Sequence, residues 1–140
     1  MIRDEKVDLL AGMRTAEACT RAQLREIARH SDVVTASPGN VLVREGAPAY
    51  EVFLIVRGEA EISHGGRPVA VCGPGDYVGE VGVLSRQARD AQVTARTPMT
   101  LLVFSAREFL GLMASIRPLN RGVLGGLASR LRESDLAAAG

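Results

Sequence analysis

The middle of the chain is a series of short apolar runs separated by glycine and proline, and this pattern restricts the possible folds more than any other feature. The runs are rich in aliphatic and β-branched residues and occupy positions 33–34, 41–43, 52–56, 60–62, 69–72, 92–96 and 99–104. The breaks include Gly65-Gly66, which favours a hairpin, and Gly73-Pro74-Gly75. Many short strands at near-regular spacing are typical of a sandwich or barrel. We therefore predict an α+β, mainly β fold: an eight-stranded antiparallel jelly-roll barrel with flanking N- and C-terminal helices.

Helical patterns flank this β region on both sides. Thr20 and Gln23 have the spacing of a capping box, in which each side chain bonds a backbone N–H at the start of a helix. Ser105 and Glu108 repeat that spacing ahead of a second apolar helical pattern. Pro118 suits the first turn of a last helix, where a missing N–H costs nothing. The sequence thus predicts a single domain over 1–140, with a helical part over 1–30, a β-roll over 32–104, and C-terminal helices over 105–133 before a frayed tail.

Charge, hydropathy and cysteine content argue against several classes of protein. The formal net charge is +1, whereas a nucleic-acid-binding domain usually carries a basic excess, so we expect no DNA or RNA partner. No apolar run approaches the roughly 18 residues that span a bilayer, and the N-terminus lacks the apolar core of a signal peptide, so no membrane association is expected. Cys19 and Cys72 lie far apart and indicate free thiols. Together these features predict a cytoplasmic protein.

The histidines argue against a metal enzyme built on the same β pattern. A cupin-type metal site needs clustered His and Glu ligands, but His30 and His64 lie far apart and no His-x-His pair occurs. The sequence also contains no Ser/His/Asp or Cys/His signature and no Walker loop. We therefore expect no catalysis, no metal and no cofactor.

Residues 73–95 form a connection longer than the usual 4–6 residues and contain the side chains best suited to bind a ligand. Gly79 to Leu84 are predicted to form one short helical turn, whose N-terminus would offer N–H groups and a partial positive charge to an anion. Glu80 supplies a carboxylate that can accept a hydrogen bond from a sugar hydroxyl. Arg89 supplies a guanidinium that matches two phosphate oxygens at once. The alternative is a tight turn with a surface carboxylate and an ordinary surface arginine. Asp76 is assigned a structural role, capping the turn that starts the short helix.

This segment resembles the phosphate-binding cassette of the cyclic-nucleotide-binding domain family. That family pattern is Gly-Asp-x-Phe-Gly-Glu, a small residue amid aliphatic ones, a variable stretch, and then Pro-Arg-x-(Ala/Ser/Thr)-x-Val. The matching residues here are Gly75, Asp76, Gly79, Glu80, Val81, Gly82, Val83, Leu84, Arg89, Ala91 and Val93. Upstream, Pro38-Gly39-Asn40-Val41, Glu45-Gly46 and Phe53 to Gly58 also resemble the family, so the resemblance covers residues 8–133. It implies a cassette over 75–93.

The resemblance implies a role for each residue of the site. Glu80 would accept the ribose 2′-hydroxyl, and Arg89 would pair with the cyclic phosphate. The backbone N–H groups around Gly79 to Val81, and that of Ala91, would add phosphate or sugar contacts. Ser129 and Arg132, on the last helix, are weaker candidates for contact with the base.

Three residues depart from the family pattern. Val78 replaces the usual Phe, and Ala88 replaces the usual Pro before Arg89. Asp90 follows Arg89, where the family commonly has Ala, Ser or Thr. A carboxylate about 5 Å from a phosphate would repel it by about 3 kcal/mol at an effective dielectric constant of 20. It would do so unless it points away or pairs with Arg86 or Arg89. Because a hydroxyl at this position often accompanies cGMP preference in the family, Asp90 favours cAMP as the ligand, with cGMP as the alternative.

The glycine-rich last helix leaves two interpretations open. Gly122, Gly125 and Gly126 each cost about 1 kcal/mol relative to Ala in a helix interior. They fit either a weak but closely packed helix or a movable lid, because the C-terminal helix of this family closes over the base and relays binding.

The leading hypothesis is a cyclic-nucleotide-binding regulatory domain that signals by movement of its C-terminal helices. It would act on a homodimer partner or a separate effector, and without a helix-turn-helix the chain is not expected to bind DNA. The alternative is a degenerate scaffold with no ligand that serves protein–protein contact or dimerisation.

Overall fold

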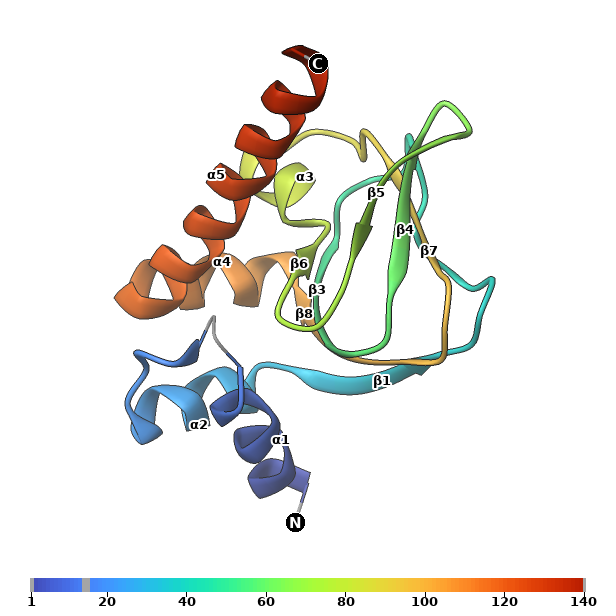
Figure 1. Ribbon diagram of the computed structural model, residues 1–140. Helices are drawn as coiled ribbons and strands as arrows, with labels where there is room; N and C mark the ends of the chain where they lie inside the picture. Colours follow the sequence, from blue (N-terminus) through green and yellow to red (C-terminus); the bar gives the residue numbers. More distant parts are fainter. Residues whose placement is uncertain (1, 14–15, 140) are drawn as a thin grey trace.

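The computed structural model describes residues 2–13 and 16–139, and within them two β-sheets carry all of their helices on one side (Figure 1). The helices are α1 (Ile2–Ala11), α2 (Arg21–Arg29), α3 (Glu80–Ser85), α4 (Ala106–Ser115) and α5 (Arg117–Ala139). The strands are β1 (Asp32–Ala36), β2 (Val41–Val43), β3 (Glu51–Arg57), β4 (Ala60–His64), β5 (Arg67–Cys72), β6 (Tyr77–Val78), β7 (Gln92–Ala95) and β8 (Met99–Ser105). This order of helices, strands and helices confirms the predicted mainly β fold with flanking helices.

The eight strands form two four-stranded antiparallel sheets, as the predicted jelly roll requires, but in the described part of the chain they do not close into a barrel. The described residues form one four-stranded sheet in the order β1-β8-β3-β6 and another in the order β2-β7-β4-β5, with every pair antiparallel. No strand pairing links the two sheets in this part of the chain, so they face each other as a roll with free edges. The runs found in the sequence correspond to seven of these strands. β6 was missed because two residues are too short to show a period.

The sheet that contains β3 and β8 is the central layer of the molecule. On one face of these strands, Val52 and Leu54 join the apolar cluster that includes the helices. On the other face, Phe53 and Ile55 join the cluster that lies between the two sheets. Because successive strand residues point to opposite faces, a strand buried on both sides has a continuous apolar run, as β3 does. The core therefore has three layers: helices, first sheet, second sheet.

Two capping patterns determine where helices begin. The Thr20 hydroxyl accepts a hydrogen bond from the Gln23 N–H at 3.1 Å, and the Gln23 side chain accepts one from the Thr20 N–H at 2.9 Å, which confirms the predicted box. The Ser105 hydroxyl likewise accepts from the Glu108 N–H at 3.2 Å. Glu108 differs from a full box, because its carboxylate accepts from the Ser105 hydroxyl at 3.0 Å. At the other end, α5 continues to Ala139, beyond the predicted boundary at 133.

The turn before α3 corrects one assignment. The Asp76 carboxylate accepts a hydrogen bond from the Gly73 N–H at 2.8 Å, so its role is structural as predicted. It closes the turn over 73–76, however, and does not cap the short helix, whose N-cap is Gly79. Cys72, just before this turn, is 3% exposed and forms no disulfide, as the sequence indicated, and its thiol donates to the Ala60 carbonyl oxygen at 3.5 Å.

Candidate ligand-binding site

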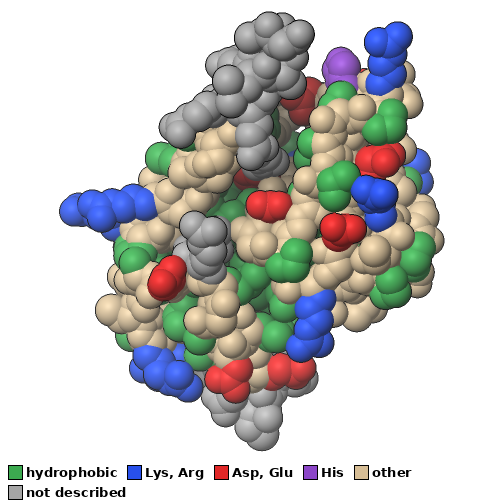
Figure 2. All heavy atoms as spheres, viewed as in Figure 1, with side chains coloured by type: hydrophobic (Ala, Val, Ile, Leu, Met, Phe, Trp, Pro, Cys, Tyr) green, Lys and Arg blue, Asp and Glu red, His purple; other side chains and the backbone are tan. Residues whose placement is uncertain are grey.

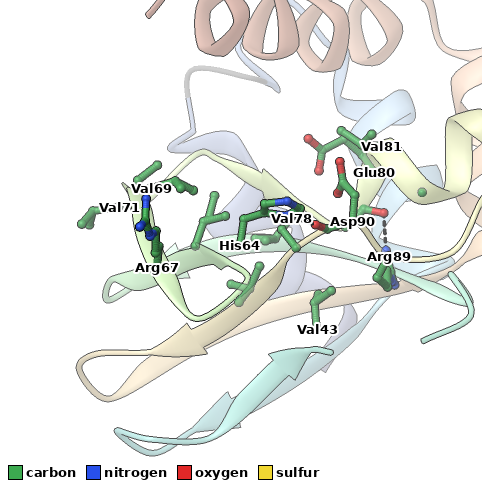
Figure 3. A pocket seen from close by; sticks show the side chains of 16 residues that line it. Val43, His64, Arg67, Val69, Val71, Val78, Glu80, Val81, Arg89 and Asp90 are labelled. Carbon is green, nitrogen blue, oxygen red and sulfur yellow. Dashed lines mark hydrogen bonds between the residues drawn. The ribbon is translucent and has the colours of Figure 1, made fainter. Parts of the chain in front are cut away.

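An open pocket of about 1280 Å³ lies between the β4–β5 hairpin and α3 (Figure 3). Typical small-molecule pockets span about 300–1000 Å³, so this one is roomy enough for a nucleotide-sized ligand. One wall is the strand β5, where Val69 and Val71 are 61% and 51% exposed. The opposite wall is α3 with the segment that follows it. All six residues that the sequence singled out for ligand contact line this pocket: Gly79, Glu80, Val81, Arg89, Asp90 and Ala91.

The Arg89 guanidinium is held inside the protein at the edge of this pocket. It is 8% exposed and donates hydrogen bonds to two carbonyl oxygens, that of Gly79 and that of Glu51, the latter at 2.5 Å. Burial lowers the pKa of Arg89, and the nearby Glu51 carboxylate acts in the opposite direction. An arginine remains charged despite such a shift, and it carries five N–H donors. The two carbonyl bonds therefore fix the guanidinium and leave further donors for an anion.

Gly79 allows this arrangement because it has no side chain. Its φ is +86°, a left-handed conformation that L side chains rarely adopt. A Cβ atom there would lie 2.6 Å from Nη1 of Arg89 and 3.1 Å from the Glu51 carbonyl oxygen. Gly82, one turn on, is almost as confined, since its Cβ would lie 2.9 Å from that of Ala49. Both glycines are therefore required by the packing around Arg89.

Glu80 adds a carboxylate to the same pocket. It is the first residue of α3 and is 1% exposed. Figure 3 shows Glu80 and Arg89 on the same side of the pocket, across from Val69 and Val71. Glutamates are almost never fully buried without a specific use. The pocket thus has an acceptor and a cationic donor on one side, opposite an apolar wall.

The loop before β3 holds Arg89 in place, which sequence reasoning missed. The Arg89 N–H donates to the Ala47 carbonyl at 2.8 Å, and the Gly46 N–H donates to the Arg89 carbonyl at 2.7 Å. Together with the Glu51 carbonyl, these bonds surround Arg89 with one loop. In the sequence, the Gly and Pro of that loop indicate a turn. They do not indicate which distant residue the loop contacts.

Asp90 lies on the solvent side of the site. It is exposed and lines the pocket. The ion pairs found among the described residues include neither Asp90 nor Arg89, so neither Arg86 nor Arg89 neutralises this carboxylate by direct pairing. The guanidinium of Arg89 instead contacts backbone carbonyls. Asp90 therefore leaves Arg89 available and adds a negative charge at the pocket mouth.

Of the two candidates for base contact on α5, only Ser129 can be placed relative to the pocket. Ser129 is exposed and is not among the residues that line it. The side chain of Arg132 lies outside the described residues. The residues that sequence reasoning did not select, but which do line the pocket, include His64, Arg67, Val69 and Val71. The sequence pattern that could have indicated them is the alternation of side chains along β4 and β5. This alternation distinguishes the two faces of a hairpin but does not show which face contacts a ligand.

Other kinds of site find little support in the described part of the chain. Residues 2–13 and 16–139 contain no group of three or more His, Cys, Asp or Glu placed to hold a metal ion. Nor does any helix in those ranges combine the length and hydropathy needed to cross a membrane. On the face drawn in Figure 2, the basic side chains lie singly among acidic and apolar ones and form no continuous patch.

Comparison with known proteins agrees with this geometry. The sequence profile of the family described as "Cyclic nucleotide-binding domain" matches residues 33–116. A cGMP-dependent protein kinase of Toxoplasma gondii is 33% identical over 106 residues, which make up 76% of this chain and 11% of that protein. The solved structure of cAMP-bound PfPKA-R superposes with a TM-score of 0.80 and 19% identity, over 96% of this chain and 48% of that one.

A third relative shows that the fold admits another kind of ligand. The regulatory subunit of a cAMP-independent protein kinase A from Trypanosoma cruzi, solved with guanosine, superposes with a TM-score of 0.76 and 19% identity. The match covers 85% of this chain and 44% of that one. At such identities the likeness concerns the fold alone. This chain spans about a tenth of the kinase and about half of each of the two structures.

Proposed function

The chain belongs to the cyclic nucleotide-binding domain family, and on that premise we propose that it is a sensor of a cyclic mononucleotide, cAMP before cGMP, with no catalytic step of its own. The observation that carries the proposal is the convergence of two buried charged side chains, Glu80 and Arg89, on one open pocket. Charged side chains are rarely buried in a folded domain, so two of them that line the same pocket indicate a binding role.

Arg89 is proposed to bind the cyclic phosphate. Its guanidinium is fixed by two carbonyl bonds, so little side-chain entropy remains to be lost when an anion arrives. The backbone N–H groups of Gly79 to Val81 and of Ala91 are proposed to add contacts to the phosphate or sugar. Glu80 is proposed to accept the ribose 2′-hydroxyl. Hydrogen bonds to charged groups contribute about 1.5–3 kcal/mol each, so two or three of them support micromolar binding.

The base is proposed to lie against the β5 wall. Val69 and Val71 expose apolar surface toward the pocket, and covering it with a flat base would be favourable at about 25 cal/mol per Å². Asp90 offers an acceptor and no hydroxyl at the position where the family resemblance relates a hydroxyl to cGMP, and this is the basis for ranking cAMP first.

We further propose that binding is relayed through the C-terminal helices. The first turns of α5 are anchored by Leu119 and Val123, which are 1% and 2% exposed. Beyond them, Leu124 is 51% exposed, Leu127 is only partly buried against the core, and α5 continues past α3 to Ala139 (Figure 1). A helix held at one end can take two positions, and a ligand that prefers one of them shifts the population. The output would pass to a second copy of the chain or to an effector protein.

Calorimetric titration of the nucleotide-stripped protein with cAMP and with cGMP tests this function. We expect one saturable site, and we expect Arg89→Ala to weaken binding by at least about a hundredfold because it removes charge-assisted bonds. Arg96→Ala is the matched control: it removes an exposed arginine from the β7–β8 loop and should leave the affinity unchanged. Wild-type protein that is folded yet gives no heat and no thermal shift at millimolar nucleotide would overturn the proposal.

The second candidate function is a scaffold that has lost its nucleotide and serves protein–protein contact. Two observations favour it. Asp90 places a carboxylate without an ion-pair partner, among the described residues, at the mouth of the pocket, where it would repel a phosphate. The regulatory subunit of a cAMP-independent kinase, moreover, has the same fold, so the fold also occurs in a protein that does not depend on cAMP. Titration with guanosine beside the cyclic nucleotides separates the candidates, since a scaffold would bind none of the three.

A further inference from the structure

The hairpin residue His64 contacts the segment that follows Arg89. It is the last residue of β4, its side chain is 68% exposed, and it lines the pocket. Its Nδ1 lies 2.7 Å from the Asp90 carbonyl oxygen. A carbonyl oxygen can only accept, so Nδ1 must carry the hydrogen. The neutral ring then has its free acceptor at Nε2, and protonation there adds a positive charge without breaking the bond to Asp90.

This bond orients one peptide group of the site. The Asp90 carbonyl and the Ala91 N–H belong to the same peptide, and the described residues contain no cis peptide. In a trans peptide the two groups point in opposite directions, so a carbonyl held toward His64 turns the Ala91 N–H away from the imidazole. The preceding peptide is fixed separately, because the Arg89 carbonyl accepts from the Gly46 N–H. Hydrogen bonding at the carbonyl also polarises the peptide and strengthens its N–H as a donor.

Charged groups from several neighbouring elements lie around the imidazole. Glu45, from the loop after β2, has a carboxylate oxygen 3.8 Å from Nδ1 and also accepts from the Gly65 N–H at 3.0 Å. Asp90 and Arg89 lie on the facing segment, Glu80 lies across the pocket on α3, and Arg67 is the cross-strand neighbour on β5. Figure 3 shows His64 and Asp90 together between β5 and α3. A bound phosphate would add a further negative charge to this group.

We propose that His64 positions the Asp90–Ala91 peptide for the ligand phosphate and, when protonated, tightens binding of the anionic ligand. The inference rests on the proposed function and adds a residue outside the cassette to it. Histidine is the side chain that ordinarily changes charge between pH 5 and 8. A cyclic phosphodiester keeps its single negative charge across that range. Affinity is therefore expected to be roughly fivefold higher at pH 6 than at pH 8 in a solvent-open pocket.

The test is the dissociation constant of cAMP at pH 6 and pH 8, measured for three variants beside the wild type. His64→Asn keeps a donor where Nδ1 stands but has no charge to gain, so it should match the wild type at pH 8 and show no pH dependence. His64→Leu loses the donor as well and should bind several-fold more weakly at both values. His30→Gln is the control, because His30 is the other histidine of the chain and its side chain forms a hydrogen bond with Glu108 instead. It should keep the wild-type profile.

Proton uptake gives a second readout that a purely structural role would not move. Titrations in two buffers of different ionisation enthalpy should show the wild type taking up a fraction of a proton on binding near pH 7, and His64→Asn taking up none. A wild type that binds with a flat profile, or a His64→Asn variant that keeps the profile, would overturn this inference and leave the proposed function standing. No binding of cAMP or cGMP at either pH would overturn both.

Discussion

Glycine serves opposite purposes in the cassette and in the last helix. Gly79 is surrounded: a Cβ atom there would approach Arg89 to 2.6 Å, and its φ is +86°. Gly125 and Gly126, in α5, would place a Cβ in open space with nothing within 4 Å. The first glycine is needed so that a charged side chain can be buried against backbone. The other two are not needed by packing, and they only lower the helix propensity of α5.

The contrast indicates a site that is built rigidly and an element beside it that is not. Arg89 has its side chain and both sides of its backbone fixed by loop and strand carbonyls or N–H groups. The part of α5 that contains Gly125 and Gly126 also has an exposed apolar residue, Leu124. Of the two interpretations that the sequence left open for α5, close packing at Gly125 and Gly126 is therefore wrong, and a movable lid remains a proposal.

The largest effect is expected from filling the space at the cassette glycine. Gly79→Ala forces the new methyl into the Arg89 guanidinium and into the Glu51 carbonyl. We expect it to displace Arg89, to weaken cAMP binding by at least about a hundredfold through lost charge-assisted bonds, and to cost about 2–4 kcal/mol of stability through steric clash and backbone strain. Calorimetry and urea unfolding measure the two effects.

Gly75→Ala is the matched control for Gly79→Ala. Gly75 has a φ of +91° but nothing within 4 Å of its Cβ position, so it shares the backbone strain and lacks the clash. It should cost only about 1–2 kcal/mol of stability and leave the affinity almost unchanged. Equal losses of affinity in the two variants would mean that backbone strain, and not contact with Arg89, explains why Gly79 is needed.

Removing the charge of Asp90 is the next largest effect, and it has the opposite sign. Asp90 is exposed and lines the pocket, so its repulsion of a phosphate lies between the values for water and for a partly buried pair, about 1–3 kcal/mol at 5 Å. We expect Asp90→Asn to tighten cAMP binding about tenfold at low salt and by less at high salt. The bond from His64 survives, because it is made to the backbone carbonyl.

Asp32→Asn controls for net charge, since Asp32 is an exposed carboxylate on β1, away from the pocket-lining residues. Its affinity should equal that of the wild type. If Asp90→Asn binds no better than Asp32→Asn, the carboxylate points its charge into solvent, and the degenerate-scaffold candidate loses its main structural support.

Features encoded within a few neighbouring positions could be predicted from the sequence, whereas contacts between distant segments could not. The strands, the Thr20 capping box and the six pocket residues could be predicted, because β-branched runs, capping pairs and the cassette pattern are all written within a few positions. The carbonyls that hold Arg89 could not be predicted, since any residue type supplies a backbone carbonyl. The contact from His64 was missed for a similar reason: a lone histidine at a strand end has no pattern until the hairpin is folded against the cassette. The open edges of the two sheets depend on strand pairing, which periodicity does not reveal.

Substituting the glycines of α5 is expected to change stability by a smaller amount, and it tests whether these glycines are free of packing constraints. Gly125→Ala and Gly126→Ala place a methyl in open space, so each should stabilise the protein by about 1 kcal/mol through helix propensity alone. Gly111→Ala is the matched variant in α4, where a Cβ also meets nothing within 4 Å. A gain for Gly111→Ala with none for the α5 pair would mean that this part of α5 unfolds independently of the core.

The smallest effect concerns the contact that fastens α4 to α2. The His30 side chain lies 2.8 Å from the Glu108 carboxylate, and this hydrogen bond, followed by that from Ser105, lowers the pKa of Glu108. A carboxyl whose folded-state pKa is lowered stabilises the protein above its unfolded-state pKa, and the contribution disappears as the pH falls through the folded-state value. Because the Glu108 side chain is 44% exposed, solvent screening keeps the contribution below about 1 kcal/mol.

Glu108→Gln should therefore lower the melting temperature slightly at pH 6 and make progressively less difference as the pH is lowered below about 4.3, the ordinary value for Glu. Glu59→Gln removes an exposed carboxylate from the turn between β3 and β4 and should show no such pH dependence. A difference in melting temperature that stays constant down to pH 3 would mean that Glu108 stabilises the protein through the geometry of its hydrogen bonds and not through its charge. In that case α4 would be held to the core by its neutral Ser105 cap and by the apolar packing of its buried residues Phe109, Leu112 and Met113.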